Sequence, residues 1–63
     1  MKSVKISLLN GKYYIFRANE NFDIRLYIED QKVSIFALYK HNTDIKKLFV
    51  TNMQNVVKLK YYK

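Results

Sequence analysis

Apolar and polar residues alternate along most of this chain, and such a period of two is typical of half-buried β-strands. The alternation is clearest over 5–9, 12–16, 22–29 and 32–39, and a shorter pair of segments covers 48–51 and 56–62. Residues that favour turns separate the two segments of each pair. The pattern therefore predicts three β-hairpins in series, with no linker, repeat or low-complexity segment between them.

The first hairpin is predicted from Asn10-Gly11, because both residues tolerate the positive φ that a type I′ turn requires. With a two-residue loop, Leu9 lies opposite Lys12 and Ile6 lies opposite Ile15. One side of this hairpin is then mainly apolar. The other side combines lysines with aromatic rings, at Lys5, Lys12, Tyr14 and Phe16.

The second hairpin joins 22–29 to 32–39. A register with Glu29 opposite Lys32 makes every facing pair on one side apolar: Ile28 with Val33, Leu26 with Ile35, and Ile24 with Ala37. The same register predicts an ion pair between Glu29 and Lys32, worth about 0–1 kcal/mol if exposed. Segment 33–39 is apolar on its other side as well, at Phe36 and Leu38, so we expect a central strand or an interface there.

The third hairpin follows a turn that is predicted from His41-Asn42-Thr43-Asp44. Residues 43–48 fit either one short helical turn or extended structure. Placing Thr51 opposite Val56 then matches Val50 with Val57 and Leu48 with Leu59, across a connection at 52–55. The second side of this hairpin again carries basic and aromatic side chains: Phe49, Lys58, Lys60 and Tyr62.

These elements predict one all-β domain over residues 1–63, built as a small antiparallel barrel or a strongly bent sheet of five to six strands. An SH3-like or OB-like barrel is favoured, because a flat sheet would leave its apolar face in water. A chain this short buries only about 60% of its unfolded surface, so its stability is marginal. It has no cysteine for disulfides, which leaves a partner or a second copy as the expected support.

The chain carries twelve basic and five acidic residues, and its formal net charge of +7 attracts polyanions. In the predicted registers, lysines and aromatic rings share the second sides of the first and third hairpins. When proteins bind single-stranded nucleic acid, lysines neutralise phosphates and rings stack on bases. We therefore expect binding of DNA or RNA, or of another partner, at one set of residues: Lys5, Lys12, Tyr14, Phe16, Phe49, Lys58, Lys60 and Tyr62.

Few residues suit catalysis, so we expect a binding protein and not an enzyme. His41 is the only histidine, and a zinc site or a general base needs partners that a cysteine-free chain does not supply. Glu29 and Asp30 lie at a predicted turn tip, where acidic side chains are commonly solvated. The single glycine, Gly11, excludes a glycine-rich phosphate loop. No metal and no cofactor are expected.

A second class of function is a protein-binding inhibitor or adaptor that binds a host protein through a sheet edge or an aromatic patch. Lys, Asn, Ile, Tyr and Phe together supply 32 residues. Their codons are AT-rich, which suggests a low-GC bacterium, a phage or a plasmid as the source. A homodimer is also expected, because a second copy would cover Phe36 and Leu38.

No apolar run approaches the about 20 residues that span a bilayer, and residues 1–3 lead straight into the alternating pattern. We therefore expect a cytoplasmic protein that does not enter a membrane. A cationic membrane-active peptide is disfavoured, because a period of two offers no amphipathic helix with a basic face.

Overall fold

The protein is built from β-strands, as the alternating pattern predicts. The computed structural model describes residues 2–63. Within them it forms β1 (Ser3–Leu8), β2 (Tyr13–Arg17), β3 (Phe22–Glu29), β4 (Lys32–Tyr39), β5 (Ile45–Asn52), a 3-10 helix η1 (Met53–Asn55) and β6 (Val56–Tyr62). The predicted all-β class and the number of strands are confirmed.

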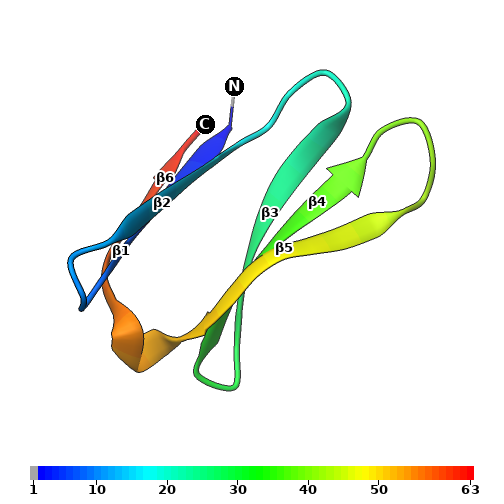
Figure 1. Cartoon of the computed structure of the whole chain (residues 1–63). Helices are drawn as coiled ribbons and strands as arrows, with labels where there is room; N and C mark the ends of the chain where they lie inside the picture. Colours follow the sequence, from blue (N-terminus) through cyan, green and yellow to red (C-terminus); the bar gives the residue numbers. More distant parts are fainter. Residues whose placement is uncertain (1) are drawn as a thin grey trace.

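The strands form two antiparallel three-stranded sheets, with the orders β2-β1-β6 and β3-β4-β5. Figure 1 shows the two sheets as separate layers, with both ends of the chain on the β2-β1-β6 sheet. The described strands do not close into a barrel. Each sheet therefore has a central strand, β1 or β4, and two edge strands.

The hydrophobic core lies between the two layers. Its fully buried side chains come mainly from the central strands: Val4 and Ile6 of β1, Val33 and Ile35 of β4, with Ile24 of β3 beside them. Burial alternates along β4, where Val33, Ile35 and Ala37 are buried and the residues between them are not. Each fully buried Val or Ile contributes about 1.5–3 kcal/mol. This core fixes which side of each sheet faces out.

The first hairpin differs from the predicted one in its turn. The Gly11 N–H donates to the Leu8 carbonyl at 3.0 Å and the Leu8 N–H donates to the Lys12 carbonyl at 2.8 Å, so the loop contains three residues. Gly11 has a φ of +85°, whereas Asn10 is not in the positive-φ region. The Asn10 Oδ1 instead accepts a hydrogen bond from the Lys12 N–H at 2.9 Å. A type I turn followed by a left-handed glycine has this arrangement.

The longer loop shifts the predicted register by one residue. Val4 lies opposite Phe16, Ile6 opposite Tyr14, and Lys5 opposite Ile15. Because side chains alternate between the two faces, a shift of one residue exchanges the sides of β2 relative to β1. The register predicted from a type I′ turn was therefore wrong.

The second hairpin has the predicted register. Glu29 lies opposite Lys32, and the apolar pairs from Ile28–Val33 to Ile24–Ala37 follow in order. The type I′ conformation occurs here, at Asp30 with φ 51° and Gln31 with φ 61°. The expected ion pair between Glu29 and Lys32 does not form among the described residues.

The third hairpin does not form. β5 pairs with β4, and β6 pairs with β1. The helix η1 carries the chain from one sheet to the other, and two hydrogen bonds anchor it: Met53 N–H to the Gln31 carbonyl at 2.7 Å, and Leu9 N–H to the Asn55 carbonyl at 3.0 Å. This pairing gives β1 and β4, the strands with the most buried residues, a neighbour on both sides.

Residues 43–48 are extended from Ile45 onward, so the helical turn considered there is not formed. The preceding turn is closed by the Asp44 N–H, which donates to Asn42 Oδ1 at 2.8 Å. The Tyr39 N–H donates to the Asp44 carbonyl at 3.2 Å and completes the connection from β4 to β5.

The N-terminal segment is joined to β3 by an ion pair, in which Lys2 Nζ lies 3.1 Å from Asp23 Oδ2. The hydrogen bond from Lys2 is the main reason that the pKa of Asp23 is lowered, and the Ile24 N–H also donates to this carboxylate. The folded-state pKa of Asp23 is thus below the about 3.9 of an unfolded chain.

Asp23→Asn is expected to reduce the loss of stability in acid. An ionised Asp23 stabilises the fold above its unfolded pKa, and this contribution is lost as the pH falls through the lower folded value. Melting temperatures measured between about pH 4.5 and pH 2 should fall less steeply for the variant than for the wild type. Equal slopes would contradict the contact between Lys2 and Asp23.

Gly11→Val is expected to destabilise the protein by about 1–3 kcal/mol, because a β-branched residue is strained at positive φ. No atom lies within 4 Å of the position that a Cβ would take, so the cost arises from the backbone alone. Thermal unfolding followed by circular dichroism measures the change. Gly11→Asn is the control, because asparagine tolerates this conformation and should lower stability far less.

Candidate nucleic-acid interface

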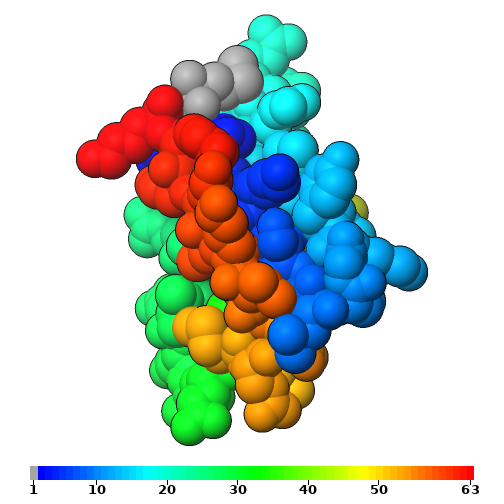
Figure 2. All heavy atoms as spheres, turned by 90° about the vertical axis from the view of Figure 1, so that its left-hand side faces the viewer, coloured from blue at the N-terminus to red at the C-terminus, as the bar shows by residue number. Residues whose placement is uncertain are grey.

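The outward side of the β2-β1-β6 sheet gathers most of the basic side chains of this half of the molecule. Because Val4 and Ile6 point into the core, the residues that alternate with them point outward. Across the sheet these residues form three rows: Tyr13–Ser7–Lys58, Ile15–Lys5–Lys60 and Arg17–Ser3–Tyr62. We call these nine residues the basic face. Figure 2 views the molecule from this side, with β6 beside β1 and β2 beyond it.

The basic face carries four cations, Lys5, Arg17, Lys58 and Lys60, and no acidic residue. Lys5 and Lys60 lie directly opposite each other on β1 and β6. Directly opposed like charges destabilise a sheet. A bound polyanion would relieve this repulsion, so the pair is better suited to binding phosphates than to stabilising the free protein.

Exposed rings and an aliphatic side chain surround these cations. Tyr13, Tyr62 and Ile15 are 59%, 48% and 45% exposed. The Lys5 ammonium lies 4.7 Å from the centre of the Tyr13 ring, in a cation–π contact. Rings that are held beside lysines on an open sheet provide surfaces on which bases can stack.

The structure brings four of the predicted site residues together on the basic face: Lys5, Lys58, Lys60 and Tyr62. Lys12 is exposed at the end of the first hairpin loop, one residue before β2. Tyr14 and Phe16 point to the other side of the sheet, opposite Ile6 and Val4.

The remaining predicted rings join the two layers. The ring centres of Tyr14 and Phe49 are 5.1 Å apart, and those of Phe16 and Phe49 are 5.7 Å apart. Phe16 and Phe49 also pack against the buried core. These distances are typical of stabilising aromatic pairs. The cluster connects edge strand β2 to edge strand β5, and its geometry is that of a packing contact between the layers.

The sequence prediction missed Tyr13, Ile15 and Arg17 on the basic face. The omission follows from the one-residue shift in the first hairpin, which exchanges Tyr13 for Tyr14 on the outward side. A three-residue loop at Leu9-Asn10-Gly11, with glycine in the last position, predicts the observed register. That register places Tyr13, Ile15 and Arg17 on the outward side.

Other kinds of site are not found in the part of the chain that the structure describes. No three histidine or acidic side chains gather there to hold a metal ion. The same residues contain no helix long and apolar enough to cross a membrane. Comparison of the chain with family models, curated proteins and solved structures finds no match.

Phe49→Ala is expected to lower stability by about 1–3 kcal/mol, less than a fully buried phenylalanine because Phe49 is half-buried. Tyr62→Ala removes a ring from the basic face and is the control, with an expected change within about 0.5 kcal/mol. Chemical unfolding of the two variants measures both values. Similar effects would show that Phe49 is not part of the packing between the layers.

Proposed function

We propose that the protein binds single-stranded DNA or RNA through the basic face and has no catalytic role. The observation that carries this proposal is the opposed pair Lys5–Lys60 within a group of four cations that no acidic residue on the same face neutralises. Nothing in the packing of the sheet requires like charges at these positions. Their arrangement is useful when a chain of phosphates lies across the strands.

The expected mode of binding combines charge with stacking. Lys58 and Lys60 stand two residues apart on β6, and Lys5 extends the positive row to the central strand. Phosphates of the bound strand would pair with these ammonium groups, while bases would stack on Tyr13 and Tyr62. Stacking is worth about 1–3 kcal/mol per base and depends little on sequence, so weak sequence preference is expected.

An open sheet face favours a single strand over a duplex. Rings exposed on an open sheet can stack only on bases that are not already stacked within a double helix. The basic face presents no helix to enter a major groove, the element through which many proteins read duplex sequence. We therefore expect stronger binding to unpaired oligonucleotides than to duplexes of equal length.

Lys60→Glu is expected to weaken binding and to stabilise the free protein. The change removes a phosphate contact, and it replaces the Lys5–Lys60 repulsion by an attraction worth about 0.2–1 kcal/mol. Fluorescence anisotropy of a labelled oligothymidine or oligouridine over a salt series measures the first effect. For four phosphate contacts, a plot of log Kd against log salt concentration should have a slope of about 3. Loss of one contact should lower the slope of the variant by about 0.7 or more.

Lys46→Glu is the matched control, because it makes the same change in net charge on β5, away from the basic face. It should bind nearly as tightly as the wild type and should not raise the melting temperature. If both variants weakened oligonucleotide binding equally, net charge alone would explain the effect. Absence of binding by the wild type at about 50 mM salt, where phosphate contacts are strongest, would refute the proposal.

A protein target is the alternative, and it would fit an inhibitor or adaptor of a phage or mobile element. Pull-downs from a nuclease-treated host lysate separate the two functions. A stoichiometric protein that is retained after the nuclease, together with no affinity for oligonucleotides, would favour the alternative.

A further inference from the structure

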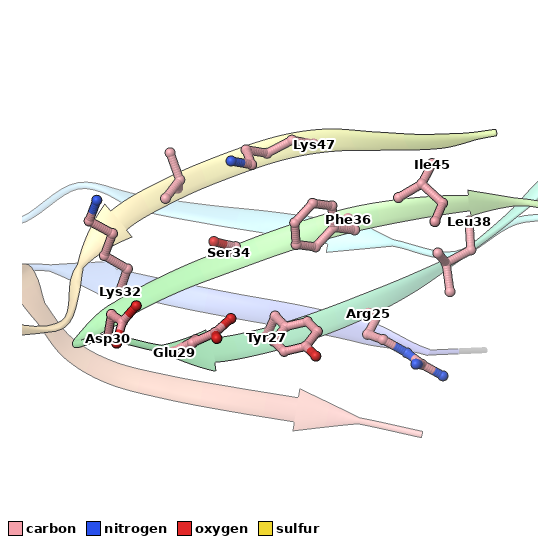
Figure 3. A pocket seen from close by; sticks show the side chains of 11 residues that line it. Arg25, Tyr27, Glu29, Asp30, Lys32, Ser34, Phe36, Leu38, Ile45 and Lys47 are labelled. Carbon is pink, nitrogen blue, oxygen red and sulfur yellow. The ribbon is translucent and has the colours of Figure 1, made fainter.

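The outward side of the β3-β4-β5 sheet forms an open groove of about 640 Å³. Figure 3 shows its side chains, which stand on one side of the three strands. Ser34, Phe36 and Leu38 of β4 form the floor, and exposed apolar side chains of the neighbouring strands flank it. Tyr27, Ile45 and Val50 are 51%, 65% and 46% exposed. An apolar surface of this kind, with charged residues around it, marks an interaction site.

The charges of the groove differ from those of the basic face. Three cations and two acids line it, Arg25, Lys32 and Lys47 with Glu29 and Asp30, so its net charge is only +1. The acids lie together at the turn between β3 and β4, whereas Arg25 and Lys47 lie farther along the strands, on either side of Phe36. A polyanion is therefore poorly matched to this surface.

The order of charges along β3 makes the groove complementary to itself. Glu29, Tyr27 and Arg25 lie on one side of the strand at intervals of two residues, with Tyr27 in the middle. Consider a twofold axis that is parallel to the sheet, perpendicular to its strands and level with Tyr27. It places Glu29 of each copy opposite Arg25 of the other.

The same operation also brings the two central strands opposite each other. Ser34 lies level with Tyr27, and Lys32 and Phe36 lie two residues to either side of it. Lys32 of one copy then lies level with Phe36 of the other, a ring whose centre is already 5.8 Å from the Lys47 ammonium of its own chain. The small Ser34 side chains meet at the axis, where they allow the two sheets to approach and leave room for Tyr27 and Val50.

We propose that the groove is the interface of a twofold homodimer, with Glu29 and Arg25 forming two reciprocal ion pairs around Tyr27. Three strands of eight residues make a face about 26 Å long and about 14 Å wide. This footprint is smaller than the about 800 Å² that each partner buries in a standard interface. The dimer is therefore weak and reversible, and its formation depends on protein concentration.

Dimerisation has a consequence for binding that rests on the proposed function. The basic face and the groove are the outward sides of two opposite layers. A dimer that is joined through the grooves therefore carries its two basic faces on opposite ends. Such a dimer would bridge two strands, or two distant parts of one strand, which a monomer cannot do.

A charge exchange tests the interface without nucleic acid. Glu29→Arg and Arg25→Glu change the net charge in opposite directions, yet each turns two attractions into two repulsions. Each variant should raise the dimer Kd about tenfold or more in sedimentation equilibrium. The double variant, Arg25→Glu with Glu29→Arg, restores both pairs and should return the Kd to within about threefold of the wild type.

Glu20→Arg is the control for net charge, because Glu20 is exposed outside the groove. All proteins are compared at one ionic strength, since salt screens both the ion pairs and the repulsion between two copies of charge +7. A wild-type monomer up to about 1 mM would overturn the proposal. The proposal would also be overturned if Glu29→Arg and Arg25→Glu raised the dimer Kd no more than Glu20→Arg does. Neither result bears on oligonucleotide binding, and a failure to bind oligonucleotides leaves the dimer proposal standing.

Discussion

The buried contact between the two central strands is the constraint on which the rest of the structure depends. Val4 and Ile6 of β1 and Val33 and Ile35 of β4 belong to one core between the layers. Ala18, Ile24 and Ala37 are the other buried apolar residues that the structure describes, so the core depends on these two strands facing each other. Once they do, the alternation of side chains determines both outward surfaces. The core thus determines which residues form the outward side of the β2-β1-β6 sheet and which form the outward side of the β3-β4-β5 sheet.

Charged residues are distributed differently on these two surfaces. The β2-β1-β6 sheet shows cations and rings without acids, and it opposes Lys5 to Lys60 at a cost in stability. The β3-β4-β5 sheet shows an apolar groove with charges of both signs. Local arrangements that oppose the stability of the free protein are most common at functional sites. We therefore propose that phosphates bind to the first surface and a second copy of the chain binds to the other.

The sequence allows the register of the second hairpin to be predicted, because its apolar pairs match in only one register and its turn has two residues. The expected ion pair between Glu29 and Lys32 could not be predicted in the same way, because both side chains are exposed. The first hairpin shows the limit of such arguments. A turn with Asn10-Gly11 fits two loop lengths, and the choice between them exchanges Tyr13 and Tyr14 between faces. The pairing of β5 and β6 with different sheets depends on contacts between distant residues, which no local pattern encodes. Neither the wrong register of the first hairpin nor the wrong pairing of β5 with β6 changes which side of the sheet Lys5 and the β6 residues face. The sequence therefore predicted four residues of the basic face correctly: Lys5, Lys58, Lys60 and Tyr62.

The orientation of the first hairpin and the function of its outward side can be tested together by nuclear magnetic resonance. An oligothymidine is titrated into the isotope-labelled protein at low salt, and side-chain shifts are followed at Tyr13, Tyr14 and Phe49. Binding at the basic face should produce large changes for Tyr13, with Tyr62 and the lysines of the basic face, and small changes for Tyr14 and Phe49. Large changes at Tyr14 and Phe49, with Tyr13 unaffected, would contradict it.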